Sequence, residues 1–464
     1  MSQAKTPNTG ETETDPESSE SLAIRWFREA SPYINAHRGK TIVFALPGEI
    51  LQSAFLPTLC HDLTLLSHLG LRLVICFGLR AQVEESLKDH GGESDIVDGR
   101  RITDSSALKT IISEAGIARN ELEARLSMGL PNTPMAGARL SVASGNYVTA
   151  QPFGVRNGVD FKHTGSVREV HGAALNTLLD AGNVVLLPPL GFSLTGDVFN
   201  ITVNEVASEC ARELDADKLV FFVDQLLHDN QGKEIRQASA RDVERLVSLS
   251  TVRLANDKEK RTGQVNARET RETTIEHAVE ACRQGIERVH LLRNDDPDAL
   301  LRELFTRDGS GTLITRERWE HVRAANNHDV FGIIELIEPL QADGTLAPRS
   351  REQLEGDLEH FVVSERDGTV VACGALFTED TQAEIACLAT HQAYRGEGRA
   401  DQILTLLEEK AKRAGCESVR LLSTRTGHWF VERGYSEVPL DALPDTRREN
   451  YNQQRNSKVY VKQL

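Results

Sequence analysis

The segment of residues 391–404 carries the residue pattern best suited to chemistry. Arg395, Gly398 and Ala400 fit the spacing Arg-x-x-Gly-x-Gly/Ala, between a predicted strand over 384–390 and a predicted helix over 401–413. Glycine lets backbone N–H groups approach a ligand without an intervening Cβ, and a helix N-terminus adds free donors and positive dipole. The segment therefore predicts an anion site suited to a pyrophosphate. On spacing alone, an ordinary strand-turn-helix fits equally well.

The elements that position this turn form a mixed α/β region. Apolar runs over 361–364, 370–376 and 383–388 predict strands, and Asp367-Gly368 is a hairpin turn signal between the first two. These patterns predict a mixed sheet with flanking helices.

The preceding part of the chain has a different pattern, in which apolar strands alternate with helices. Strands are predicted over 41–46, 71–77, 184–187 and 218–223, and a helix over 55–69. Continuously apolar strands between helices indicate a mainly parallel sheet covered on both faces, a three-layer α/β fold. Before it, residues 20–36 predict an amphipathic helix that Pro32 breaks or kinks, with Tyr33 just after it.

Composition limits the class of protein. The chain has 464 residues, enough for two or three domains, and a net charge of -16, which argues against a general nucleic-acid surface. No stretch of about 20 apolar residues predicts a membrane span. Seven scattered Cys without a Cys-x-x-Cys pair indicate neither zinc nor a disulfide framework, and suit the cytoplasm. Residues 1–20 are expected to be a disordered tail.

Two motifs relate the C-terminal region to known families. The turn at 395–400 and the strand, short helix and Glu-Arg-Gly-Tyr ending of 421–435 resemble the GCN5-related N-acetyltransferases. The tail over 443–459, with Pro348-Arg-Ser-Arg-Glu-Gln-Leu354, resembles the acetyltransferase half of the bacterial N-acetylglutamate synthases. The resemblance implies transfer of acetyl from acetyl-CoA, as cosubstrate, to L-glutamate, the first step of arginine biosynthesis, with no cofactor and no metal.

The resemblance also implies roles for individual residues. Glu384 is expected to be the general base through a water, helped by a partly apolar strand that would raise its pKa, and Ser423 to protonate the departing thiolate of CoA. Without the resemblance, an exposed strand glutamate and a strand-end serine would be ordinary. The residues expected to bind acetyl-CoA are Cys387, Leu388, Ala389, Arg395, Gly396, Glu397, Gly398, Arg399 and Ala400. Cys387 also raises the question of a covalent nucleophile, but a buried Cys more often serves packing.

Glutamate brings two carboxylates, so its site needs cations. Arginine forms planar bidentate pairs with carboxylates. The resemblance places Arg455 and Ser457 at the glutamate, together with Arg349 or Arg351, between which the register does not decide. Solvated surface arginine is the alternative for each.

Residues 21–313 resemble the amino-acid kinase family. The matching segments are Val97–Asp104, Ala216–Asp224 and Leu300–Thr312. The phosphate-binding parts depart from that family: its Lys and Gly pair is replaced in Phe44–Glu49, its glycine run is reduced in Cys76–Ala81, and Asn204 stands where it has Asp. Because phosphoryl transfer depends on such groups, we expect a kinase fold without kinase chemistry. A linker over 314–320 then leads to the acetyltransferase domain, 321–464.

A kinase fold without kinase chemistry suggests regulation. By resemblance, L-arginine is expected to inhibit as an effector, and the N-terminal helix, with Trp26, Phe27 and Ile34, to link a homo-oligomer, a hexamer. The expected arginine-site residues are Tyr33, Lys218, His290, Glu303, Gly309 and Gly311. Their alternative role is to hold the domain together.

Three other functions compete with glutamate acetylation. A metabolite kinase fits the length and fold but lacks the phosphate machinery. A non-enzymatic arginine sensor is opposed by Glu384, Ser423 and the CoA turn. A protein acetyltransferase shares the second fold, although the arginine motifs favour a small dicarboxylate.

Overall fold

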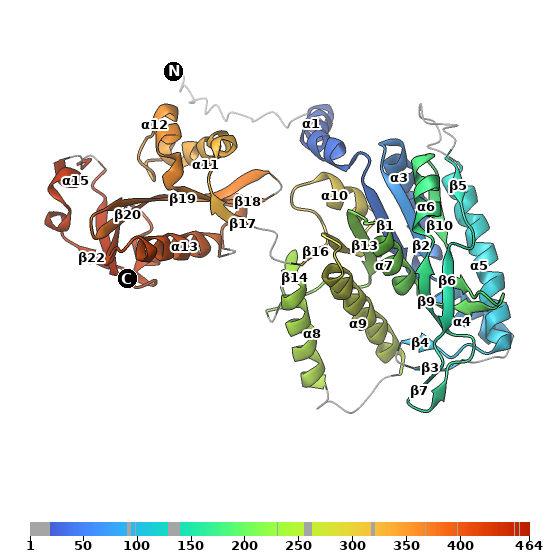
Figure 1. Cartoon of the computed structure of the whole chain (residues 1–464). Helices are drawn as coiled ribbons and strands as arrows, with labels where there is room; N and C mark the ends of the chain where they lie inside the picture. Colours follow the sequence, from blue (N-terminus) through green and yellow to red (C-terminus); the bar gives the residue numbers. More distant parts are fainter. Residues whose placement is uncertain are drawn as a thin grey trace, which may run out of the picture. The chain divides into compact units, whose positions relative to one another are not determined.

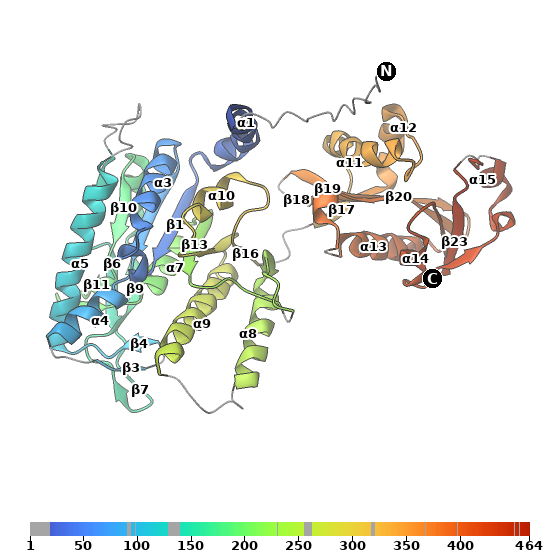
Figure 2. The same ribbon diagram turned by 180° about the vertical axis from the view of Figure 1, so that it is seen from behind.

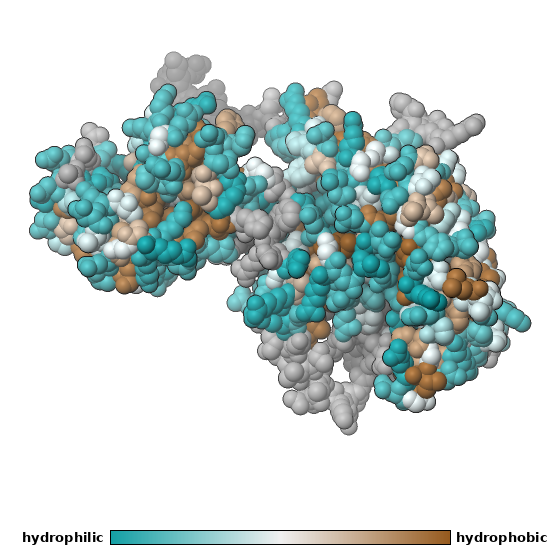
Figure 3. Space-filling view, in the orientation of Figure 1, coloured by the Kyte–Doolittle hydropathy of each residue, from teal (hydrophilic) through white to brown (hydrophobic). Residues whose placement is uncertain are grey.

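The chain forms two compact units, Met1–Glu317 and Arg318–Leu464. The computed structural model describes residues 19–90, 94–97, 99–128, 140–229, 231–254, 262–316, 321–366, 368–396, 398–449, 451–453 and 455–464. Hydrophilic residues cover most of the visible face of each unit, with apolar patches between them (Figure 3). Within the described ranges, no helix is both long enough and apolar enough to cross a membrane.

The first unit is built on an eight-stranded sheet of order β14-β16-β15-β13-β1-β2-β10-β5. All its pairs are parallel except β15 with β16. The strands are β1 Thr41–Leu46, β2 Arg72–Phe77, β5 Val142–Ala143, β10 Val184–Leu187, β13 Lys218–Val223, β14 Gln237–Ser239, β15 Val289–Arg293 and β16 Thr312–Thr315. The predicted strands are confirmed, because fully apolar runs are buried on both faces. β16 takes in Ile314 and Thr315, the first residues of the expected linker; residues 317–320 lie outside the described ranges.

Helices cover both faces of this sheet, which confirms the three-layer fold (Figure 1). Alternate residues of β1 enter different cores: Val43 and Ala45 one, Ile42 and Phe44 the other. The first core is closed by α6 Gly172–Asp180, α7 Val203–Glu213, α8 Ala240–Leu254 and α9 Thr262–Arg283. The second is closed by α1 Ser19–His37, α3 Leu56–His68, α4 Arg80–Asp89, α5 Ser105–Leu126 and α10 Ala299–Phe305. The short α2 is Gly48–Leu51.

A smaller sheet adds to the first unit, with order β12-β11-β6-β9. Its strands are β6 Val148–Pro152, β9 Gly165–Val170, β11 Leu190–Phe192 and β12 Val198–Asn200. Two short hairpins pair β3 Ile96–Val97 with β4 Arg100–Arg101, and β7 Val155–Arg156 with β8 Val159–Asp160.

Helix α1 is not broken at Pro32, and Tyr33 lies within it rather than after it. Packing explains why the helix continues despite the missing proline N–H. Ala30 is fully buried, and Tyr33 and Ile34 pack against the second core. His37, at the end of the helix, lies 2.8 Å through Nε2 from the carbonyl oxygen of Leu304 on α10. The contact between His37 and Leu304 therefore holds the end of α1 against α10.

The second unit is a seven-stranded sheet of order β17-β18-β19-β20-β21-β23-β22. Only β20 and β21 pair in parallel, so the sheet is mixed, as predicted. The strands are β17 His321–Ala324, β18 Phe361–Arg366, β19 Thr369–Glu379, β20 Gln382–Thr390, β21 Ser418–Ser423, β22 Ser436–Val438 and β23 Lys458–Gln463. β18 and β19 form the predicted hairpin.

Helices lie on both faces of this second sheet (Figures 1 and 2). α13 Arg399–Arg413 packs Ile403, Leu404 and Leu407 on one face. α11 Val330–Ala342 and α12 Arg351–Gly356 pack on the other. The short α14 Gly427–Val431 and α15 Asp445–Glu449 lie in the connections after β21 and before β23.

Candidate active site

The strand β20 is irregular where chemistry was predicted. Its pairing with β19 shifts register between Cys373 and Ala375, opposite Cys387, which has φ of 52°. A positive φ is uncommon for a residue with a side chain, and a bulge turns backbone groups out of the regular ladder. The parallel ladder with β21 also ends at Ile385, while β20 runs on to Thr390. The backbone N–H and C=O groups of Cys387 and its neighbours thus depart from the regular hydrogen-bond ladder of the sheet.

The thiol of Cys387 is not suited to nucleophilic attack. The residue is buried, and burial raises the pKa of its thiol, although Arg349 and Arg455 oppose that shift. A thiolate is the reactive form of cysteine. Cys387 therefore contributes through its backbone conformation rather than as a nucleophile, and the nearby Cys373 donates its thiol to the Cys387 carbonyl at 3.4 Å.

The turn after β20 has the geometry of an anion site. Gly396 and Gly398 have φ of 82° and 80°, and Gly398 is the N-cap of α13, a helix of 15 residues. Only glycine takes these conformations at little cost. The free N–H groups of the first turn of α13 are therefore presented by a glycine turn, as in known phosphate sites.

The predicted acetyl-CoA residues differ in their exposure. Arg395 is exposed, whereas the Arg399 guanidinium is buried against the Tyr394 ring at 4.7 Å and donates to the Tyr394 carbonyl at 3.2 Å. Arg399 can thus contribute to the anion site through its backbone N–H group and not through its guanidinium. Ala389 is buried, Leu388 and Ala400 are half-buried, and Glu397 lies outside the described residues.

Glu384 lies in an ionic environment, not the partly apolar one expected from its strand. Its carboxylate accepts hydrogen bonds from Arg447 Nε, at 2.8 and 3.1 Å, and from Arg447 Nη2 at 3.0 Å. Arg420, its direct partner on β21, donates from Nε at 3.4 Å. In turn, the Glu384 carboxylate raises the pKa of the Arg447 guanidinium. Two arginine side chains therefore contact the Glu384 side chain, which is 12% exposed.

Neither arginine that contacts Glu384 was predicted from the sequence as a site residue. Arg420 gave a usable signal, because a charged residue within the apolar run Val419–Leu422 needs a partner on the sheet. Arg447 stood in the quoted C-terminal tail, but nothing local ties it to residue 384, 63 positions earlier.

Ser423 ends β21 and is buried. Its Oγ lies 3.0 Å from Thr426 Oγ1 and accepts a hydrogen bond from the Thr426 backbone N–H at 3.1 Å. The hydroxyl is therefore oriented by the turn that leads into α14, and it stands on the strand next to the one that carries Glu384.

The two arginines of the Pro-Arg-Ser-Arg turn face different surroundings. Arg349 pairs with Asp357 at 2.6 Å, lies 5.2 Å from the Phe377 ring and influences the thiol of Cys387. Arg351 is exposed and pairs with Glu355 one helical turn later. The geometry thus favours Arg349 over Arg351 as a residue of the site.

Arg455 approaches the same cysteine from the C-terminal segment. Its Nη2 donates to the Thr345 carbonyl at 2.9 Å, and its charge acts on the Cys387 thiol. Its buried Nε has no hydrogen-bond partner among the described residues. Ser457, two residues later, is buried. Arg349 and Arg455 therefore bring two cations to the bulge of β20, where a carboxylate would be stabilised.

The first unit has a cavity of about 300 Å³ at the carboxyl ends of β1, β2 and β13. Residues of the three segments that depart from the kinase-family pattern line this cavity, among them Gly48, Gly78 and Asn204. Asn204 donates through Nδ2 to Thr274 Oγ1 at 2.9 Å. An amide cannot carry the negative charge with which an aspartate would hold magnesium beside a nucleotide. Within the described chain, no group of His, Cys, Asp and Glu side chains is arranged to hold a metal ion.

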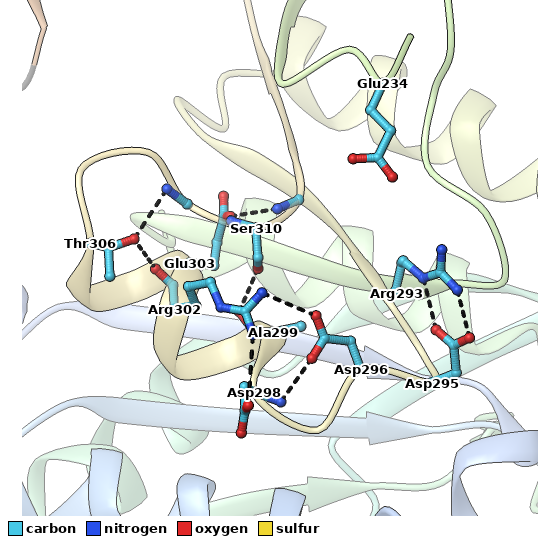
Figure 4. A network of polar contacts seen from close by, with 12 residues as sticks. Glu234, Arg293, Asp295, Asp296, Asp298, Ala299, Arg302, Glu303, Thr306 and Ser310 are labelled. Carbon is cyan, nitrogen blue, oxygen red and sulfur yellow. Dashed lines mark hydrogen bonds and ion pairs between the residues drawn. The ribbon is translucent and has the colours of Figure 1, made fainter. Parts of the chain in front are cut away.

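Several residues of the expected arginine site form one buried network. Glu303 on α10 accepts from the backbone N–H group of Ser310 at 2.7 Å (Figure 4) and from that of Gly311 at 2.8 Å. Its carboxylate also lies 2.6 Å from His290 Nδ1. Burial would raise the pKa of Glu303, but these donors outweigh it and lower the pKa to about 2. Burial and the nearby Lys218 lower the pKa of His290. Gly309, with φ of 62°, leaves no room for a Cβ beside Glu303.

The polar groups of this network pair with one another in the structure. The backbone N–H groups of Gly309 and Gly311 donate to Thr306 Oγ1 and to the Glu303 carboxylate. Tyr33 packs against the core on α1, whose His37 contacts α10 next to Glu303. The six residues thus share one region, between α1, β13, β15 and α10.

Comparison with known proteins agrees with this two-unit structure. Residues 40–293 match the Amino acid kinase family, and residues 330–434 match the Acetyltransferase (GNAT) family. Amino-acid acetyltransferases of Pseudomonas putida (strain GB-1) and Pseudomonas fluorescens (strain Pf0-1) are 44% and 43% identical to this chain, over 95% of it and 99% of each relative.

Solved structures show the same likeness. A crystal structure of N-acetylglutamate synthase from Neisseria gonorrhoeae, complexed with coenzyme A and L-arginine, has a TM-score of 0.81 at 36% identity. A second, with coenzyme A and N-acetyl-glutamate, has a TM-score of 0.59 at 35% identity. Each likeness covers 95% of this chain and 99% of the other.

Proposed function

The chain belongs to the bacterial N-acetylglutamate synthase family of amino-acid acetyltransferases, and we propose that it transfers acetyl from acetyl-CoA to the α-amino group of L-glutamate. It is an acyltransferase. The observation that carries the choice of glutamate is the convergence of Arg349 and Arg455 on the bulge at Cys387. Two guanidinium groups beside the irregular backbone of the β20 bulge suit a small dicarboxylate substrate better than a protein lysine.

The reaction needs a base, a polarised carbonyl and an acid. Glu384 takes a proton from the substrate ammonium through a water, and the free amine attacks the thioester carbonyl. The backbone at the β20 bulge donates to the developing oxyanion. When the C–N bond has formed and the C–S bond breaks, the Ser423 hydroxyl gives its proton to the CoA thiolate and regains one from the proton that the new amide nitrogen loses, while the proton on Glu384 passes to solvent. The glycine turn before α13 binds the pyrophosphate of CoA.

The similarity to known relatives also supports a proposal about how the enzyme is regulated. The Neisseria enzyme has been crystallised with L-arginine, and this chain has the buried Glu303–His290 network where sequence analysis expects arginine. We therefore propose that the enzyme makes the first intermediate of arginine biosynthesis in the cytoplasm and that L-arginine inhibits it at the first unit. The kinase-like domain, predicted as 21–313, would extend through the end of β16, and the acetyltransferase domain would be 321–464.

We also propose that α1 links copies of the chain into a hexamer. Ile24, Trp26 and Phe27 are 49%, 47% and 60% exposed, whereas Ala30 on the same helix is buried. Trp26→Ser with Phe27→Ser should lower the mass measured by light scattering without unfolding the protein. Phe331→Ser, at an exposed position of the second unit, is the control. An unchanged mass would reject this role for α1.

The substrate is tested by CoA release with acetyl-CoA and each free amino acid in turn. Glutamate should support turnover well above the others, and ATP with N-acetylglutamate should give no phosphorylated product. If another amino acid is preferred, the substrate is wrong; if ATP is consumed with N-acetylglutamate, the first unit is a kinase.

A further inference from the structure

The Ser423 hydroxyl is held by a neighbour in its own turn, Thr426. Among the described residues, Ser423 Oγ has two hydrogen-bond contacts, and both are with Thr426: it accepts from the Thr426 backbone N–H at 3.1 Å and lies 3.0 Å from Thr426 Oγ1. A hydroxyl has one donor hydrogen and two acceptor positions. Because the backbone N–H fills one acceptor position, the direction of the bond between the two hydroxyls decides where the Ser423 hydrogen can go.

The two directions of this bond have different chemical consequences. If Ser423 donates to Thr426, its only hydrogen is engaged and cannot reach a departing thiolate. If Thr426 donates to Ser423, both acceptor positions of Ser423 are filled, and its hydrogen is available to an acceptor on the substrate. The second arrangement lets Ser423 act as the acid, and it also sets two donors on the oxygen that gains negative charge as its proton leaves.

The Thr426 hydroxyl does not cap the helix that follows it. Thr426 is the N-cap residue of α14, a position at which a threonine side chain commonly accepts a hydrogen bond from the first turn of the helix. Within the described chain, its side chain makes no such bond. Its hydroxyl lies against Ser423 Oγ instead, so its contact with the expected acid replaces the usual structural use of a threonine at this position.

Ser423 stands where two strands of the sheet part. The parallel ladder between β20 and β21 ends at the pair Ile385 and Leu421. Two residues further along each strand, the same register would set Cys387 opposite Ser423, but Cys387 lies in the β20 bulge. On its other side the strand end is still held, because Ser423 pairs with Lys458 of β23. The hydroxyl of Ser423 therefore belongs to a fixed strand end, across from the bulge to which the developing oxyanion is assigned.

From these contacts we propose that Thr426 is a positioning residue, which donates through Oγ1 to Ser423 and so directs the Ser423 proton to the CoA thiolate. This inference rests on the proposed function. Thr426 keeps its own proton throughout: as the C–S bond breaks, the proton passes from Ser423 Oγ to sulfur, and Ser423 regains one from the new amide nitrogen. The two donors of Thr426 stabilise the charge on Ser423 Oγ between these transfers.

The test compares Thr426→Val, Thr426→Ser and Thr424→Val in the full chain, together with Ser423→Ala and the double variant Ser423→Ala with Thr426→Val. Valine has about the shape of threonine without its hydroxyl, and every variant keeps the backbone N–H of residue 426. Thr424 is the matched control, because it is an exposed threonine in the same turn. For each variant, kcat, the KM for glutamate, the KM for acetyl-CoA and the melting temperature are measured.

Thr426→Val should lower kcat about fivefold to tenfold, within the range expected for the loss of one hydrogen bond, and change each KM by less than about twofold. Thr426→Ser should recover most of that loss, because it restores the hydroxyl, and Thr424→Val should leave kcat in place. In the Ser423→Ala background, Thr426→Val should cause no further loss of kcat, because Thr426 acts through the Ser423 hydroxyl.

Three outcomes would overturn the proposal. An unchanged kcat in Thr426→Val would mean that its hydroxyl does not orient the acid. An equal loss in Thr426→Ser would assign the effect to the shape of the side chain. A loss of the same size in the Ser423→Ala background would mean that Thr426 acts independently of Ser423. Failure of the proposed function is a separate result, in which the unchanged protein releases no CoA with glutamate.

Discussion

Arg349 and Asp357 form an ion pair at 2.6 Å that places the Arg349 guanidinium beside Phe377 and Cys387, while Arg351, two residues later, pairs outward with Glu355. One turn thus presents one arginine to the β20 bulge and the other to solvent. The capping box of α12 fixes this register, because Ser350 caps the helix and Arg351 is its first residue.

Arg349→Ala should raise the KM for glutamate by about 100-fold, as expected when a charged hydrogen bond worth about 3 kcal/mol is lost. Arg351→Ala should change it by less than about twofold, because an exposed pair within a helix contributes little. Steady-state kinetics on both variants check the assignment. Equal effects would place both arginines at the substrate.

Arg455→Ala should weaken glutamate binding by a similar factor and leave acetyl-CoA binding unchanged. The buried Nε of Arg455 has no hydrogen-bond partner among the described residues, so a substrate carboxylate is its natural acceptor. Calorimetric titration with each ligand separates the two affinities. If both affinities fall together, Arg455 supports the fold of the site instead of binding glutamate.

Glu303→Gln should relieve inhibition by L-arginine at least about tenfold, a coupling of about 1.4 kcal/mol, while the activity without arginine stays within about twofold. Glutamine keeps the size of the side chain beside Gly309 but removes the charge that a guanidinium would need. The measurement is the arginine concentration for half-inhibition. Full inhibition of the variant, or direct competition between arginine and glutamate, would exclude this site.

The same residue should contribute to stability in acid. The pKa of Glu303 is lowered to about 2 from 4.5, so its ionised form stabilises the fold above about pH 4.5 and this contribution is lost as the pH falls toward 2. Between pH 7 and pH 3, Glu303→Gln should lose about 1–2 kcal/mol less free energy of unfolding than the unchanged protein. Glu280→Gln, at an exposed helix position, serves as the control. A loss equal to that of the unchanged protein would mean that Glu303 is not ionised in the fold.

Sequence patterns predicted the fold well because the parallel strands are apolar throughout. The β1, β10 and β13 ranges were predicted to the residue, since each is buried on both faces. The continuation of α1 through Pro32 was not predictable, because packing of Ala30 and Tyr33 outweighs a local breaking signal. The short β6, β9, β11 and β12 carry no comparable apolar run.

The site was predictable to the level of motifs and not of contacts. The glycine turn was recognisable from the sequence, because Gly396 and Gly398 take positive φ, a conformation that favours glycine. The pairing of Glu384 with Arg447 joins residues 63 positions apart, and no local pattern encodes such a contact. For the same reason, sequence alone left Arg349 and Arg351 equivalent, whereas the ion pair with Asp357 distinguishes them.

One product analysis tests the proposed acetylation of glutamate directly. The full chain and Glu384→Gln are incubated with acetyl-CoA and an equimolar mixture of free amino acids, and the acetylated products are identified by mass spectrometry. N-acetyl-L-glutamate should be the main product, and Glu384→Gln should lower turnover about 100-fold or more, as expected for loss of a general base, while acetyl-CoA still binds. An acetylated amino acid other than glutamate, or equal turnover by Glu384→Gln, would contradict it.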